Sequence, residues 1–277
     1  MPPKILVISG PTASGKTALA VELALRHNGE VVSADSMQIY RRMDIGTAKP
    51  TAEEMGGVPH HMIDVADPEE DFSAARYVDM AARCVDDILA RGKLPVLAGG
   101  TGLYIDSLLS GRTFAAFSPD SPLRGELEEQ LRREGGQAML DRLARVDPEA
   151  AARLHPNDAK RIIRALEVYF TTGRSITQHN RETQALPPRY DALTLTLAFG
   201  RREDMWARID RRVDQMMGKG LEGEVRALLA SGVPERCTAM QAIGYKEMAA
   251  ALRSGGDVPA AAEGIKVRSR QYAERLL

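Results

Sequence analysis

The feature that most constrains the fold is the segment GPTASGKT at residues 10–17, which fits the pattern GxxxxGK[ST]. An apolar run at residues 5–8 precedes it, and a helix-like stretch at 17–28 follows it. The glycines permit a tightly curled backbone, whose N–H groups at a helix N-terminus bind phosphate oxygens. Lys16 adds a positive charge, and the hydroxyl of Thr17 can ligate Mg²⁺. The motif predicts a strand, a phosphate-binding loop and a helix, but it does not identify the phosphate compound or the reaction.

The first 110 residues alternate strand-like and helix-like segments. After the loop come an apolar run at 31–33, an amphipathic stretch at 75–92 and a third apolar run at 94–98. Repeated strand, turn and helix predict an α/β fold, in which helices cover both faces of a parallel sheet.

The sequence pattern changes near Ser118, where a loop rich in Pro, Ser and Asp precedes a long helical region. Within that region Asn157 is a candidate N-cap for a helix that Gly173 would end. We therefore predict a catalytic core of residues 1–117 and 191–277, with a helical insert at residues 118–190.

Composition excludes several classes of protein. No apolar run approaches the roughly 18–20 residues that a membrane helix needs. The N-terminus lacks the pattern of a secretory signal peptide. Cys84 and Cys237 lie far apart without a metal-binding spacing, which disfavours a disulfide framework or a zinc site. We expect a cytoplasmic protein without a membrane partner.

Charge is unevenly distributed, although the net charge is only −1. Residues 53–90 carry 10 acidic and 2 basic side chains, whereas residues 153–212 carry 12 basic and 7 acidic ones. Such segregation can steer a polyanion to one region, although two solvated surfaces of opposite sign would give the same pattern.

Two polar residues follow predicted strands at the edge of the sheet where ligands bind. Asp35 follows the second strand, and Thr101 lies in the turn GGTG after the third strand. Asp35 could ligate a metal, act as a base or cap the next turn. The GGTG turn could admit a ligand close to the backbone or could only connect a strand to a helix.

Basic residues gather on two predicted helices. Lys160, Arg161 and Arg164 lie on neighbouring ridges of one helix, beside the apolar positions Ile162 and Leu166. On a later helix, an apolar stripe leaves three arginines elsewhere on the surface: Arg208, Arg211 and Arg212. Either group could contact a polyanion or form a solvated face. The adjacent histidines at 60–61 point in different directions. This disfavours a shared metal site and favours a structural role for the pair.

Together these segments resemble the bacterial tRNA dimethylallyltransferases, also called tRNA isopentenyltransferases. The resemblance covers nearly the whole chain and rests on GPTASGKT at 10–17, ADSMQIYRRMDIGTAKP at 34–50, HHMIDV at 60–65, GGTGLY at 99–104, NDAKRIIRALEV at 157–168 and MQAIGYKE at 240–247. The sequence departs from the family at Arg42, which stands where the family usually has glycine.

The resemblance implies a P-loop NTPase-like parallel sheet flanked by helices, with an all-helical insert that grips the anticodon stem-loop of tRNA. It implies transfer of a dimethylallyl group from dimethylallyl diphosphate to N6 of adenosine-37, with Mg²⁺ as cofactor and release of diphosphate. It assigns catalysis to Asp35 and Thr101. It assigns diphosphate binding to Gly10, Thr12, Ala13, Ser14, Gly15, Lys16, Thr17 and Arg208, with Thr17 also on the metal. It assigns tRNA contacts to Asp35, Ser36, Met37, Gln38, Thr101, Arg124, Lys160, Arg161, Arg164, Met240, Gln241, Gly244 and Tyr245.

The chemistry explains these residue types. An adenine amine is a poor nucleophile, so a carboxylate that accepts its proton helps the C–N bond to form. Diphosphate leaves when its growing negative charge is stabilised by cations, N–H groups and metal.

Two alternatives use the same loop: a P-loop kinase of small molecules, and an isopentenyltransferase that acts on free AMP, ADP or ATP. The basic insert favours RNA, and we expect a monomer.

Overall fold

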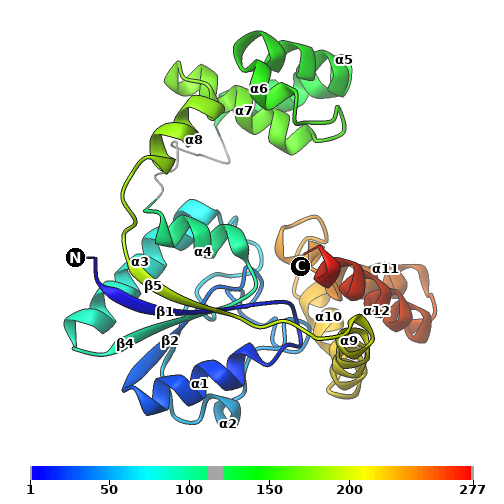
Figure 1. Cartoon of the computed structure of the whole chain (residues 1–277). Helices are drawn as coiled ribbons and strands as arrows, with labels where there is room; N and C mark the ends of the chain where they lie inside the picture. The colour runs from blue at the N-terminus through cyan, green and yellow to red at the C-terminus, as the bar shows by residue number, and fades with distance from the viewer. Residues whose placement is uncertain (1, 112–120, 276–277) are drawn as a thin grey trace. The chain divides into compact units, whose positions relative to one another are not determined.

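The computed structural model describes residues 2–111 and 121–275. The chain folds into two compact units, a core unit (Met1–Leu109 with Arg189–Leu277) and a helical unit (Ser110–Pro188). The predicted boundary between residues 117 and 118 lies outside the described residues. The sequence predicts that the chain re-enters the core at residue 191, and in the structure the core unit resumes at Arg189. Figure 1 shows the two units, which we describe separately.

The core unit is built on a five-stranded sheet in the order β3-β2-β4-β1-β5, in which every pairing is parallel. Its strands are β1 (Lys4–Ser9), β2 (Gly29–Ser33), β3 (His60–His61), β4 (Leu94–Ala98) and β5 (Asp191–Thr196). Helix α1 (Lys16–Arg26) covers one face, and α3 (Ala74–Ala90) with α4 (Gly102–Leu109) covers the other (Figure 1). The predicted α/β fold with a parallel sheet is confirmed.

Strand register fixes where the functional loops emerge. In β4, Ala98 pairs with Ile8 of β1 on one side and with Ser33 of β2 on the other. These three strands therefore end at one level, and the loops that follow them, at 10–15, 34–36 and 99–101, leave the same edge of the sheet.

The short helix α2 (Ala52–Met55) contacts α1, whereas the other helices of the core unit pack around the segment that follows β2. They are α9 (Arg202–Gly218), α10 (Leu221–Ala230), the 3₁₀ turn η1 (Ala239–Gln241), α11 (Tyr245–Ser254) and α12 (Val258–Glu274). One buried apolar cluster joins Ile39 and Met43 to Val213 of α9, Val225 of α10 and Met248 of α11. The chain after residue 34 is therefore held by helices that lie far from it in the sequence.

The helical unit has a core of its own. Its helices are α5 (Pro122–Val146), α6 (Pro148–Ala151), α7 (Ala159–Thr172) and α8 (Ile176–Gln184). Ile162 and Leu166 of α7 are fully buried beside Leu143 of α5, as the apolar pattern predicts. Asp158, one residue after the predicted Asn157, occupies the N-cap position, and Gly173 ends α7 with φ 72° as expected.

The two adjacent histidines contact different partners. Nδ1 of His60 is 2.9 Å from the carbonyl oxygen of Val58, whereas Nε2 of His61 is 2.8 Å from a carboxylate oxygen of Glu30. Hydrogen bonds from Arg91, above all, hold the pKa of the buried Glu30 carboxyl well below its usual range. The structural interpretation of the pair agrees with these contacts. None of the helices among the described residues is long and apolar enough to cross a membrane.

Candidate active site

The phosphate loop connects β1 to α1, as the motif predicts. It carries seven of the expected diphosphate-binding residues: Gly10, Thr12, Ala13, Ser14, Gly15, Lys16 and Thr17. Gly10 has φ 140°, and a Cβ atom there would lie 2.5 Å from the carbonyl oxygen of Leu197. Gly15 occupies the N-cap position of α1 with φ 91°. Both glycines are therefore required by the backbone path, which aims the first N–H groups of α1 into the loop.

Lys16 is a partly buried cation inside this loop. Its Nζ donates a hydrogen bond of 2.6 Å to the carbonyl oxygen of Pro11. Burial, followed by the nearby positive charge of Arg212, lowers the pKa of Lys16 to about 8, although the negative charge of Asp35 opposes the shift. The hydroxyl of Ser14 is buried and has no hydrogen-bond partner among the described residues. An anion with several oxygens would satisfy both groups.

Helix α9 brings two arginines to the loop. Nη2 of Arg208 lies 4.0 Å from where a Cβ atom of Gly15 would be, and this places the predicted Arg208 beside the loop. Arg212, one turn later, donates from Nη2 to the carbonyl oxygen of Thr47 at 3.4 Å. Burial lowers the pKa of Arg212, while the charge of Asp35 acts in the opposite direction. The sequence placed Arg212 with Arg208 and Arg211 outside the apolar stripe of this helix but gave it no role at the phosphate loop; its four-residue spacing from Arg208 was the available signal.

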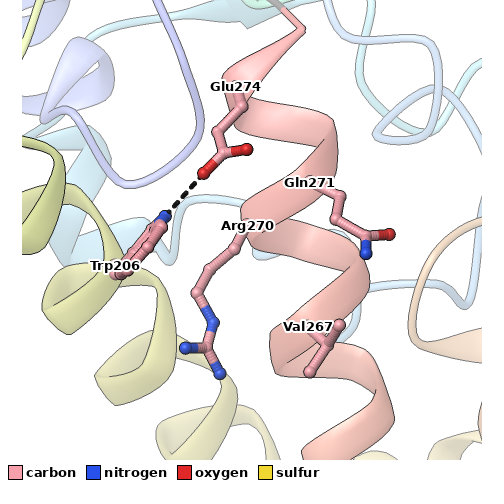
Figure 2. Close-up of a pocket in the computed structure, with 5 residues that line it drawn as sticks. All are labelled: Trp206, Val267, Arg270, Gln271 and Glu274. Carbon is pink, nitrogen blue, oxygen red and sulfur yellow. Dashed lines mark hydrogen bonds between the residues drawn. The ribbon is translucent and has the colours of Figure 1, made fainter.

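The position of α9 is fixed by apolar packing and by α12. Ala13 of the loop packs against the cluster of Met205, Ile209 and Ala273. Figure 2 shows Nε1 of Trp206 donating to Glu274, at 3.0 Å, in a groove of about 250 Å³ between α9 and α12. That groove is lined by Trp206, Val267, Arg270, Gln271 and Glu274, none of which belongs to the phosphate loop.

Asp35 and Thr101 lie in adjacent loops at the same edge. Oδ1 of Asp35 accepts hydrogen bonds from the N–H groups of Met37 and Gln38, at 2.8 and 3.3 Å. The predicted cap of the next turn is therefore present, and the second oxygen, Oδ2, takes no part in it. Oγ1 of Thr101 accepts from the N–H of Ser36 at 3.0 Å. The two loops are thus joined next to Asp35.

The oxygen atoms that the protein offers at this edge of the sheet fit a Mg²⁺ ion whose other ligands come from a bound substrate and water. The described residues contain no group of three or more His, Cys, Asp or Glu side chains that could enclose a metal. Thr17 at the start of α1 and Asp35 after β2 offer oxygen atoms, which Mg²⁺ prefers. Magnesium bound to substrate phosphates usually takes one or two protein ligands and keeps several waters, and these two residues fit that pattern.

A family model described as IPP transferase matches residues 38–276. This chain belongs to the IPP transferase family. The tRNA dimethylallyltransferase of Acetivibrio thermocellus is 46% identical to it over 271 residues, which span 98% of this chain and 86% of that protein. The tRNA dimethylallyltransferase of Geobacter sulfurreducens is 49% identical over 276 residues, which span 99% and 88%.

Solved structures of relatives have the same fold. The full-length tRNA isopentenylpyrophosphate transferase of Bacillus halodurans matches with a TM-score of 0.70 and 45% identity, over 99% of this chain and 85% of that one. A eukaryotic dimethylallyltransferase, described as acting on tRNA, matches with a TM-score of 0.86 and 31% identity, over 99% and 69%. This chain therefore shares its mixed α/β fold with these tRNA isopentenyltransferases.

In this member of the IPP transferase family, the backbone explains the departure at Arg42. Arg42 has φ 64°, a left-handed conformation that glycine adopts without strain. Its guanidinium donates to both carboxylate oxygens of Glu69, at 3.0 and 3.2 Å, and to Oγ of Ser231 at 3.0 Å. These bonds hold the Arg42 side chain between Glu69 and Ser231 at the surface.

The predicted RNA-binding cations of the helical unit differ in their surroundings. The side chain of Arg161 is 75% exposed, with Asp158 3.8 Å away. Arg164 forms an ion pair of 2.9 Å with the buried carboxylate of Glu167, and Arg124 lies 3.6 Å from the same carboxylate. Arg161 and Arg164 are therefore not equivalent, since only Arg161 presents most of its surface to solvent.

The residues of the MQAIGYKE motif that are expected to touch tRNA differ in their burial. Met240 and Tyr245 are fully buried in the apolar cluster of the core unit. Gln241 is exposed and donates to the carbonyl oxygen of Glu235 at 2.7 Å. Gly244 precedes α11 with φ 101°. For all four residues of this motif, a tRNA contact stays a prediction.

Proposed function

We propose that this protein transfers a dimethylallyl group from dimethylallyl diphosphate to N6 of adenosine-37 in tRNA and releases diphosphate. The observation that carries the proposal is the placement of Asp35 and Thr101 at the edge of the sheet where the phosphate loop opens. Similarity over nearly the full length to curated tRNA dimethylallyltransferases supports the choice of donor and acceptor.

The phosphate loop binds the diphosphate of the donor. Backbone N–H groups at the start of α1, the hydroxyl of Ser14 and the ammonium of Lys16 are directed at its oxygens, and Arg208 approaches from α9. Magnesium, held by Thr17 and substrate oxygens, would neutralise part of the charge. Because these groups are fixed before the reaction, little reorganisation is needed as charge grows on the leaving group.

Asp35 accepts the proton that N6 loses. The lone pair of N6 forms the new C–N bond, the C–O bond to diphosphate breaks, and its electron pair leaves with the diphosphate. Met37 and Gln38 hold Oδ1 of Asp35, which leaves Oδ2 as the proton acceptor. Thr101 fixes the loop that carries Asp35 through its bond to Ser36.

Arg212 acts on charge at the centre of the site. It lies within electrostatic reach of both Lys16 and Asp35, and it is partly buried. A desolvated cation interacts more strongly with an anion than an exposed cation does. Arg212 therefore stabilises the negative charge that develops on diphosphate.

The helical unit supplies the phosphate contacts to tRNA. Lys160 and Arg161 are exposed at the start of α7, and they would neutralise RNA phosphates. A base inside the anticodon loop has to leave its stack to reach a catalytic carboxylate. The proposal includes a monomer that works in the cytoplasm, where it meets its RNA partner.

The test compares two acceptors with one donor. The protein is incubated with dimethylallyl diphosphate and Mg²⁺, together with either unmodified tRNA or AMP, and both products are examined by mass spectrometry. We expect a five-carbon addition to tRNA alone, without any need for ATP. Addition to AMP alone would replace the proposal with the free-nucleotide enzyme. Release of ADP in proportion to product would restore the kinase alternative.

A further inference from the structure

Two sequence motifs that lie far apart meet at the carboxylate of Glu224, on α10. Its Oε2 accepts hydrogen bonds from the N–H groups of Asp44 and Ile45, both at 2.8 Å. Its Oε1 accepts from the N–H of Gly46 at 3.1 Å and from the hydroxyl of Tyr245 at 2.5 Å. One side chain thus satisfies three consecutive backbone donors and a buried phenol.

The geometry of this contact explains both motifs. Three successive N–H groups form a concave site that binds an anion, and the carboxylate of Glu224 fills it. A Cβ atom at Gly46 would lie 2.4 Å from the ring of Tyr245, so only glycine lets the loop approach. Burial and the neighbouring carboxylate of Glu224 raise the pKa of Tyr245 well above its usual range. The phenol therefore stays protonated and remains a donor.

The loop that Glu224 holds continues directly into the active site. Its next two carbonyl oxygens, those of Thr47 and Ala48, accept hydrogen bonds from Nε2 of Gln38, at 3.4 and 3.3 Å. The carbonyl of Thr47 also accepts from Arg212, at 3.4 Å. The N–H of Gln38 donates to Asp35. An unbroken chain of contacts therefore runs from Glu224 to the two charged groups at the reaction centre.

We propose that Glu224, with Tyr245 as its partner, is a positioning residue for catalysis, which sets the places of Gln38 and Arg212 around Asp35. The inference rests on the proposed function, and it gives the Tyr245 position a role other than RNA contact. None of the four hydrogen-bond partners of Glu224 belongs to the phosphate loop, and Arg212 is only one of several groups placed to meet the diphosphate. Breaking the network should therefore lower the affinity for diphosphate less than it lowers the rate of transfer. Misplacement of catalytic groups by about 1 Å can cost on the order of a hundredfold in rate.

The kinetic test uses a graded series of variants. Tyr245→Phe removes one of the four hydrogen bonds, Glu224→Gln retains one acceptor oxygen, and Glu224→Ala removes them all. We expect kcat with saturating tRNA and donor to fall progressively along this series, reaching a loss of about 30- to 100-fold for Glu224→Ala. The dissociation constant of inorganic diphosphate, measured by calorimetry, should change less than about threefold. Glu222→Gln, on the exposed side of the same helix, is the matched control and should retain wild-type values.

A second measurement does not depend on activity. Hydrogen exchange of peptides covering residues 40–50 should be much faster in Glu224→Ala than in Glu222→Gln, while exchange in β1 should be unchanged. Unchanged exchange at 40–50 would overturn the anchoring, whether or not the protein modifies tRNA. Faster exchange with a kcat within twofold of the control would overturn the positioning role. Equal losses of kcat and diphosphate affinity, with exchange raised throughout the core unit, would show a purely structural role. Failure of the wild-type protein to modify tRNA would instead refute the proposed function.

Discussion

The hydroxyl of Thr101 accepts a hydrogen bond of 3.0 Å from the backbone N–H of Ser36, and it thereby joins the loop after β4 to the loop after β2. The same two loops are in contact through their backbones, because the N–H of Thr101 donates to the carbonyl oxygen of Ala34 at 3.0 Å. A Cβ atom at Gly99 would lie 2.2 Å from that carbonyl oxygen. The GGTG turn is thus shaped to hold the segment that carries Asp35.

The first prediction concerns the acceptor at this junction. Thr101→Val preserves the shape of the side chain but leaves the N–H of Ser36 without its partner, which costs about 1–3 kcal/mol where the group is buried. We expect turnover to fall at least about tenfold, because Asp35 is then held less firmly. Thr101→Ser keeps the hydroxyl and should retain most activity. Equal turnover of the two variants, in assays at saturating substrates, would show that the hydroxyl has no part in the reaction.

The second prediction separates the two roles of Asp35. Asp35→Asn keeps an oxygen that can accept from Met37 and Gln38, so the turn should persist, but the amide cannot take a proton. We expect turnover to fall at least about a hundredfold, while tRNA affinity and melting temperature stay close to wild type. Asp35→Ala should lose the same activity and should also melt at a lower temperature. Near wild-type turnover of Asp35→Asn would exclude Asp35 as the base.

Much of the core site could be predicted because its signals are local. The phosphate loop, Asp35 and Thr101 each directly follow a short apolar run, and parallel strands bring the segments after such runs to one edge. The apolar runs, the composition of the loops after them and the expectation of a parallel sheet were enough to predict this shared edge. The same reasoning predicted the burial of Ile162 and Leu166, since helical spacing alone puts both on one face.

The residues that sequence reasoning missed depend on packing between distant segments. Arg212 contacts Thr47 across 165 residues of sequence, and Glu224 contacts Asp44 across 180. The hydrophobic periodicity of a short stretch of sequence does not indicate such a contact, and an acidic residue on an amphipathic helix ordinarily faces solvent. The motif around Tyr245 was visible, but only the fold shows that its ring is buried. For Arg164 a signal did exist, because Glu167 follows it at a spacing that favours an ion pair.

The third prediction uses the lowered pKa of Lys16, which is about 8. The ammonium attracts diphosphate only while it is protonated, so affinity for inorganic diphosphate should decrease as pH rises through about 8. Lys16→Arg keeps a positive charge over this range, and its binding should lack that decrease. Ionisation of diphosphate itself affects both proteins equally, so the ratio of their dissociation constants isolates the effect of deprotonating Lys16. Calorimetric titrations between pH 7 and about 9.5 provide the measurement. A constant ratio across this range would show that Lys16 does not titrate there.

The fourth prediction distinguishes two arginines of one helix. Arg161 is exposed, so Arg161→Ala should weaken tRNA binding and reduce the slope of log affinity against log salt by somewhat under one unit. Its melting temperature should stay near that of the wild type, because alanine is favourable in helices. Arg164→Ala instead removes an ion-pair partner of the buried Glu167, and it should lower the melting temperature clearly. The double variant should show both effects. Filter binding over a range of salt concentrations and thermal melts separate them, and unchanged tRNA binding of Arg161→Ala would mean that RNA is held by other residues.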